Sequence, residues 1–104
     1  MKKFTGLFLN KPSYEKAEFE YQIIGDVRNY NSNNNCIIVK ALYYDLSLFL
    51  DGLSLIITEK GSRVSHITLM ARERNIPIIK IPKIINMIPS SGRLIIKNEE
   101  IEFK

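Results

Sequence analysis

The sequence is poor in the residues on which disulfides, metal sites and membrane segments depend. Its 104 residues include one cysteine, one histidine and no tryptophan. Because the single Cys36 cannot form an internal disulfide, nothing indicates an oxidising compartment. The apolar stretch 4–9 lacks the pattern of a signal peptide, and no apolar run approaches the ~20 residues that a membrane span needs. We therefore expect a cytoplasmic protein without a membrane-spanning segment.

Charge of one sign is not concentrated in any part of the chain. Fifteen lysines and arginines outnumber eleven acidic residues, which gives a formal net charge of +4 and a pI near 9.3. The five tyrosines and five phenylalanines are not interleaved with the basic residues, as a stacking platform for nucleic acid would require. We do not expect a nucleic acid as partner, although a small basic nucleic-acid-binding domain stays open as an alternative. The scattered charges are more typical of a solvated surface of mixed charge, and the basic balance could also help to dock an anionic nucleotide or a phosphorylated partner.

The composition is that of one globular domain spanning residues 1–104. Apolar residues make up 45% of the chain and charged residues 25%, a mixture that can bury a core. Frequent isoleucine favours strands, because β-branched side chains suit a pleated, packed surface. Strands are predicted over residues 4–9, 19–24, 53–58, 78–81, 93–97 and 101–103, and short helical turns over 46–50 and 84–88. The Asn-rich segment 29–35 predicts a loop, and we expect it to join 21–28 and 36–40 in a hairpin.

One principal helix is predicted from residue 65 to about residue 74. Apolar side chains recur there at helical spacing, at Ile67, Met70 and Ala71. Ser65 is a suitable N-cap, Asn75 suits the left-handed position that closes a helix, and Pro77 prevents continuation. The order of elements predicts an α/β domain in which this helix packs on the strand 53–58.

The only histidine, His66, lies at the start of this helix. Unpaired backbone N–H groups and the positive end of the helix dipole favour an anion there. An imidazole in that place could hold a phosphoryl group, with hydrogen bonds from Ser62 and Ser65 and charge-assisted ones from Arg63. Arg72 lies farther along and could instead pair with Glu73 or Glu59. By position alone, a single histidine at a helix start is more often structural or merely exposed.

The residues around His66 follow a known pattern. The segment 58–77 resembles the phosphohistidine segment of the phosphoenolpyruvate-utilising enzymes, a family that includes pyruvate phosphate dikinase, phosphoenolpyruvate synthase and the phosphoenolpyruvate–protein phosphotransferase of sugar uptake. The positions that match the family pattern are Thr58, Gly61, Ser65, His66, Ala71, Arg72, Glu73, Ile76 and Pro77. Upstream of Cys36 the resemblance fades.

The resemblance implies a fold and a function. The fold is the swivelling β/β/α phosphohistidine domain, with one principal helix following the His66 loop. The function is that of a phosphoryl carrier, in which Nε2 of His66 is phosphorylated while a local hydrogen bond holds Nδ1. The residues then expected to contact the phosphate are Thr58, Gly61, Ser62, Arg63, Ser65 and Arg72.

The resemblance also implies partners, because the chain contains no Walker motif, dinucleotide fingerprint or acidic pair with metal-ligand spacing. We expect separate nucleotide-binding or phosphoenolpyruvate/pyruvate-binding subunits or domains, and Mg²⁺ bound there with ATP or phosphoenolpyruvate. This chain itself is expected to bind no cofactor or metal and to be inactive alone.

Of the residues that depart from the family pattern, three concern the surroundings of His66. Ser62 replaces the second glycine of a pair, and a serine would be strained there if the position required a positive φ. Ile67 and Thr68 stand where small residues are usual, so the surroundings of His66 are expected to be tighter. These departures keep open a non-catalytic interaction module that retains the swivelling fold.

Overall fold

The structure, a computed structural model, describes residues 2–10, 14–25 and 34–104. The strands are β1 (Lys2–Thr5), β2 (Leu7–Phe8), β3 (Tyr14–Ile23), β4 (Cys36–Val39), β5 (Leu55–Thr58), β6 (Ile78–Lys80), β7 (Ser91–Asn98) and β8 (Glu100–Phe103). The helices are α1 (His66–Glu73) and the short 3-10 helices η2 (Tyr44–Leu48), η3 (Leu50–Gly52) and η4 (Ile84–Met87). The domain is thus mixed α/β and mostly sheet, and α1 is the one α-helix among the described residues, as the sequence predicts.

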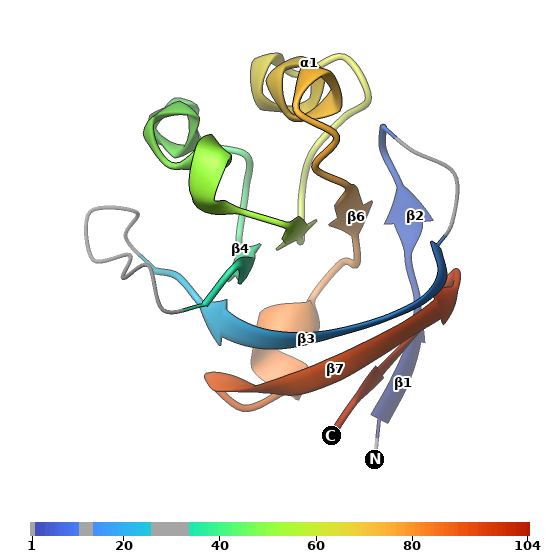
Figure 1. The fold of residues 1–104 in the computed structure, drawn as a ribbon. Helices are drawn as coiled ribbons and strands as arrows, with labels where there is room; N and C mark the ends of the chain where they lie inside the picture. The colour runs from blue at the N-terminus through green and yellow to red at the C-terminus, as the bar shows by residue number, and fades with distance from the viewer. Residues whose placement is uncertain (1, 11–13, 26–33) are drawn as a thin grey trace.

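The strands form one mixed sheet in the order β1-β8-β7-β3-β4-β5-β6-β2. The neighbours β3, β4, β5 and β6 run parallel to one another, and the remaining pairs are antiparallel. In Figure 1 the long strands β3 and β7 curve beneath the short parallel strands, whereas α1, η2 and η3 lie above these strands. The chain ends lie together at the side opposite α1, where Lys2 pairs with Phe103.

The predicted hairpin between 21–28 and 36–40 is wrong. Strand β3 pairs with β4 in parallel, with Tyr21 opposite Cys36 and Ile23 opposite Ile38. The antiparallel neighbour of β3 is β7, which comes much later in the chain. The short polar segment between two apolar runs is typical of a hairpin, but the sheet orders these strands by non-local pairing. Residues 11–13 and most of the predicted loop 29–35 lie outside the described residues.

The single early strand predicted over 4–9 is divided at Gly6. The two halves pair with different strands, β1 with β8 and β2 with β6. A Cβ atom at Gly6 would lie 2.3 Å from Cγ2 of Ile79 and 2.8 Å from Cδ1 of Ile101, both buried side chains. Glycine is therefore needed at this division because the chain passes directly over the core.

Apolar side chains fill both faces of the parallel strands. Ile37 and Val39 of β4 join the cluster beneath the helices, while Cys36 and Ile38 join the cluster on the other face. This alternation is the two-residue period of a strand buried on both sides. The helix-side cluster contains Ile56 of β5 together with the α1 residues Ile67 and Ala71, and Met70 packs against it, which confirms the predicted packing of the helix.

Local signals at the ends of α1 are also confirmed. Ser65 is the N-cap, and its side-chain oxygen accepts a hydrogen bond from the Thr68 N–H. Asn75 has the left-handed φ of 57° that follows a helix end. In the described ranges 2–10, 14–25 and 34–104, no helix has the length and apolar character to span a membrane.

Candidate functional site

The candidate site lies at the carboxyl ends of two neighbouring parallel strands. Strand β4 ends at Val39 and leads into η2, and β5 ends at Thr58 and leads through the loop 59–65 into α1. The adjacent strands therefore bring η2 and the start of α1 together, and these two helices are in contact. In open α/β sheets ligands bind at this edge, because the loops after the strands converge there.

A chain of hydroxyl groups fixes the end of the loop before α1. The Thr68 hydroxyl donates to the Ser62 carbonyl oxygen at 2.7 Å. Its oxygen therefore serves as acceptor for the Ser65 hydroxyl, which lies 2.6 Å away. Thr68 is almost fully buried, so the network is protected from water. The Ser65 hydroxyl proton, predicted to contact phosphate, is used within this network.

The beginning of the loop is held in a similar way. The hydroxyl of the buried Thr58 donates to the Lys60 carbonyl oxygen at 2.6 Å. The Glu59 carboxylate accepts the Ile85 N–H of η4 at 2.9 Å, and among the described residues it forms no ion pair with Arg72. At Gly61, an added Cβ would lie 2.8 Å from Cδ1 of Leu42. Thr58 and Gly61 thus shape the loop in this conformation.

The departures from the family pattern cause no strain in this loop. Ser62 is not among the described residues with positive φ, so the serine adopts an ordinary conformation. Ile67 points into the helix-side cluster and Thr68 into the hydroxyl network. Neither therefore crowds the imidazole of His66.

His66 is the first residue of α1 and its side chain is exposed. Its imidazole stacks against the ring of Tyr44, the first residue of η2, with ring centroids 5.2 Å apart and an angle of 19° between the planes. No described residue forms a hydrogen bond to either ring nitrogen of His66, so the hydrogen bond to Nδ1 implied by the resemblance is not seen. The first turn of α1 carries no acidic residue, and an anion would meet no repulsion there.

The remaining predicted residues fall into two groups. Ser62 and Arg63 are exposed in the loop next to His66, and their side chains have no hydrogen-bond or ion-pair partner among the described residues. Arg72 is exposed in the last turn of α1. It follows His66 by six positions, which corresponds to about 9 Å along the helix axis and to a different side of the helix. The geometry favours Arg63 over Arg72 for a direct contact with a group on His66.

Exposed apolar side chains gather around the same place. The structure describes seven large hydrophobic residues as exposed, and five of these belong to η2, the residue before it, the loop or α1: Tyr43, Tyr44, Leu48, Val64 and Leu69. Leu48 and Val64 are 78% and 79% exposed. Exposed apolar side chains concentrated in neighbouring elements are typical of a surface that contacts another protein.

The family pattern described as "PEP-utilising enzyme, mobile domain", where PEP is phosphoenolpyruvate, matches residues 32–96, which is more than half of the chain. The chain belongs to this family. The match contains η2, the His66 loop and α1, and the family implies a phosphoryl-carrier role in general. No curated protein matches the chain.

A solved structure shares the fold of this mobile domain. The chain is similar to the solution NMR structure of a UPF0107 protein from a structural genomics consortium, with a TM-score of 0.60. The two sequences are 12% identical, and the comparison covers 99% of each chain. At this identity the similarity concerns the fold alone.

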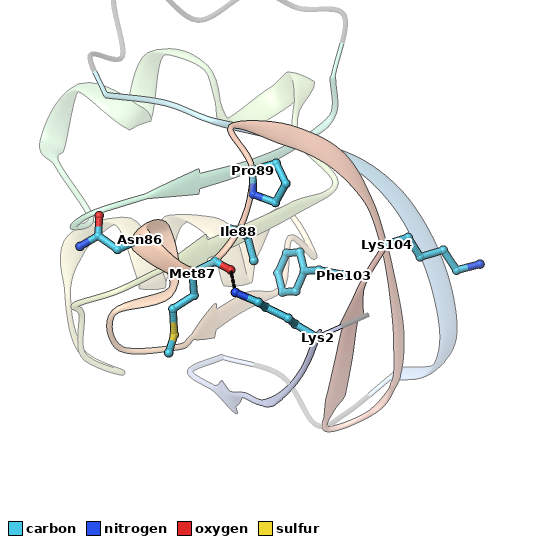
Figure 2. A pocket seen from close by; sticks show the side chains of 7 residues that line it. All are labelled: Lys2, Asn86, Met87, Ile88, Pro89, Phe103 and Lys104. Atoms are coloured by element: carbon cyan, nitrogen blue, oxygen red, sulfur yellow. Dashed lines mark hydrogen bonds between the residues drawn. The ribbon is translucent and has the colours of Figure 1, made fainter.

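The mobile domain also has a hollow at the end opposite α1. It has a volume of about 470 Å³ and is lined by Lys2, Asn86, Met87, Ile88, Pro89, Phe103 and Lys104. Figure 2 shows the Lys2 side chain reaching across it, where its Nζ donates to the Met87 carbonyl oxygen at 2.7 Å, and the Lys104 side chain pointing away. The lining contains no histidine, cysteine or carboxylate side chain.

The described part of this mobile domain contains no group of three or more histidine, cysteine, aspartate or glutamate side chains placed to hold a metal ion. Cys36 is fully buried, and this burial raises the pKa of its thiol. The cysteine therefore stays protonated and takes no part in the chemistry of the site.

Proposed function

We propose that this mobile domain is a phosphoryl carrier whose nucleophile is His66. The observation that carries the proposal is the exposed imidazole at the start of α1, inside the segment that matches the family. The chain's only histidine thus occupies a place where unpaired backbone N–H groups and the helix dipole favour an anion.

The proposed reaction has two steps. In the first, the lone pair of an imidazole nitrogen of His66 forms a bond to phosphorus while the bond from phosphorus to the donor oxygen breaks, and the electron pair leaves on that oxygen. In the second, an acceptor oxygen attacks the phosphorus, the N–P bond breaks and the imidazole is regenerated. Following the family resemblance, Nε2 is the nitrogen that carries the phosphoryl group.

The neighbouring side chains have different proposed roles. Arg63 and Ser62 are free to bind the oxygens of the phosphoryl group, where a charge-assisted hydrogen bond stabilises the developing charge. Thr58, Gly61 and Ser65 contribute by holding the loop, and their contacts with phosphate would be made through the backbone. Arg72, in the last turn of α1, would act on the donor or the partner surface rather than on the group bound to His66.

The donor and acceptor sites belong to partner chains or domains in this proposal. Nucleotide-binding and phosphoenolpyruvate/pyruvate-binding partners would supply them, and Mg²⁺ bound with ATP or phosphoenolpyruvate would neutralise phosphate charge there. The exposed apolar residues around His66 would contact these partners in turn. A swivelling motion of the whole domain would carry His66 from one site to the other.

A non-catalytic interaction module is the second candidate. The exposed Leu48, Val64 and Leu69 favour it, because they would suit a protein contact whether or not His66 is phosphorylated. The two functions differ in what His66 does, so the experiment below separates them.

The test is to incubate the chain with ATP or phosphoenolpyruvate and Mg²⁺, with and without candidate subunits from the same organism. We expect label only with a cognate subunit, and we expect it to be lost in mild acid and to be stable in base, as a phosphorus–imidazole bond is. His66→Gln should remove it. Acid-stable label that persists in this variant would point to a serine or threonine, and absence of label with every candidate would favour the non-catalytic module.

A further inference from the structure

We propose that Tyr44 is a positioning residue for His66: its phenol ring stacks on one face of the imidazole and fixes the orientation in which the ring nitrogens are presented. The evidence for this inference is the contact between the two rings. The role given to the contact rests on the proposed carrier function. Sequence reasoning gave Tyr44 no role, and the family pattern around 58–77 does not include it.

The two rings are presented by segments that cannot move independently. Leu46 and Leu50, just after Tyr44, are buried in the helix-side cluster, and Ile67 and Ala71 of α1 are buried in the same cluster. Since cores are close-packed, this shared cluster fixes the first turn of η2 relative to the first turn of α1.

The geometry of the pair suits a reacting imidazole. Rings 5.2 Å apart and tilted by 19° form a near-parallel stack, one of the arrangements that aromatic pairs prefer. A phosphoryl group bound to an imidazole nitrogen lies in the plane of the ring, whereas Tyr44 covers a face. The stack therefore restricts rotation of the imidazole and leaves its edge open to a donor.

The stack also performs a task that no hydrogen bond performs in the described structure. An exposed side chain samples several rotamers, and holding a reactive group in one of them favours transfer to a donor that approaches from a fixed direction. Because no described residue holds either ring nitrogen, the face contact with Tyr44 is what orients the ring.

The experiment compares four proteins: wild type, Tyr44→Leu, Tyr44→Phe and Tyr43→Leu. Phenylalanine keeps the stacking face and removes only the hydroxyl. Tyr43 is the matched control, because it is an adjacent, 49% exposed tyrosine that makes no ring contact with the described residues. The first readout is the chemical shift of the two carbon-bound ring protons of His66, because the imidazole is stacked near the tyrosine ring and experiences its ring current.

The second readout uses phosphoramidate, a small donor that needs no partner protein. An imidazole nitrogen forms the N–P bond, the P–N bond of phosphoramidate breaks, ammonia leaves and the imidazole proton passes to water. The measurement is the initial ratio of the Nε2- and Nδ1-phosphorylated forms of His66, determined by ³¹P and ¹⁵N NMR. A fixed ring presents its two nitrogens unequally, and loss of the stack should make them more equal.

We expect Tyr44→Leu to abolish the ring-current shift and to change the isomer ratio roughly 2- to 10-fold, the range that corresponds to an aromatic pair. Tyr44→Phe and Tyr43→Leu should retain both the shift and the ratio. An unchanged shift or ratio in Tyr44→Leu would overturn the proposal. If wild-type His66 accepts no phosphoryl group from phosphoramidate, the ring-current shift alone decides whether Tyr44 orients the ring, and the labelling with partner subunits decides the carrier function separately.

Discussion

The two ends of the molecule use their polar side chains differently. At the end with the hollow, side chains hold the backbone: Lys2 donates to the Met87 carbonyl oxygen, and the Tyr21 hydroxyl donates to that of Pro89. At the His66 end, the buried hydroxyls of Thr58 and Thr68 donate hydrogen bonds to carbonyl oxygens of the loop. The exposed His66 and Arg63 are therefore not needed to hold the loop. A site that must bind and release a group requires side chains that the fold itself does not use.

The largest expected effect is the loss of all acid-labile phosphate in His66→Gln. The fold should be preserved, because the His66 side chain is exposed and is not part of the core. Phosphoramidate labelling followed by mild acid measures the phosphate on His66, and thermal unfolding measures the stability of the fold. Lys2→Ala at the other end is the control and should label as the wild type does. Equal loss of label in both variants would show that the two ends of the molecule do not differ in their role in phosphorylation.

Arg63→Ala should slow labelling of His66 by roughly 10- to 100-fold, the range of one or more charge-assisted hydrogen bonds. Arg72→Ala should have a smaller effect, because Arg72 lies nearly two helical turns away from His66. Initial rates with phosphoramidate at several concentrations provide the measurement. If Arg72→Ala were the slower of the two, the assignment of Arg63 to the phosphoryl group would be wrong.

Gly6→Ala should lower the free energy of unfolding by about 1–3 kcal/mol, because the new methyl group overpacks the core against Ile79 and Ile101. Gly52→Ala is the matched control, since nothing lies within 4 Å of an added Cβ there. Urea unfolding followed by circular dichroism measures the difference. Labelling per folded molecule should stay constant, which would separate the stability of the sheet from the chemistry at its edge. Similar stability of the two variants would contradict the close packing at Gly6.

The smallest effect concerns pH. Burial raises the pKa of the Cys36 thiol, whereas an unfolded cysteine ionises near pH 8.5. Above that pH the folded state binds more protons than the unfolded state, so the free energy of unfolding should fall as pH rises, by up to about 1.4 kcal/mol per pH unit. Urea unfolding at intervals from pH 7 to 10 tests this, and Cys36→Ala should show a flatter profile. The same slope in the variant would assign the effect to other groups.

The sequence predicts those features that depend on neighbouring residues. Ser65 as N-cap, Asn75 in the left-handed conformation and the buried face of α1 all follow from local spacing, and the structure shows each of them. The family pattern likewise lies in one continuous segment. For the same reason, the exposed place of His66 at a helix start could be predicted without knowing the sheet.

Features that depend on strand order could not be predicted. The hairpin expected before Cys36 is wrong because β7, far along the chain, takes the antiparallel edge of β3. Tyr44 reaches His66 only because β4 and β5 are neighbours, so that residues 22 positions apart meet. The one signal that could have suggested Tyr44 is its place just after an apolar strand, where an aromatic residue would be exposed at the edge of the sheet.

The division at Gly6 has a consequence for the behaviour of the protein in a concentrated solution. The two outermost strands of the sheet, β1 and β2, are consecutive in the chain, so each outer edge is only four or two residues long. Exposed edge strands are where other chains add by backbone hydrogen bonding and where β-aggregation starts. Edges this short, with Lys2 and Lys3 on one of them, give an incoming strand little to pair with. A domain rich in isoleucine and sheet is thereby protected against self-association through its strands.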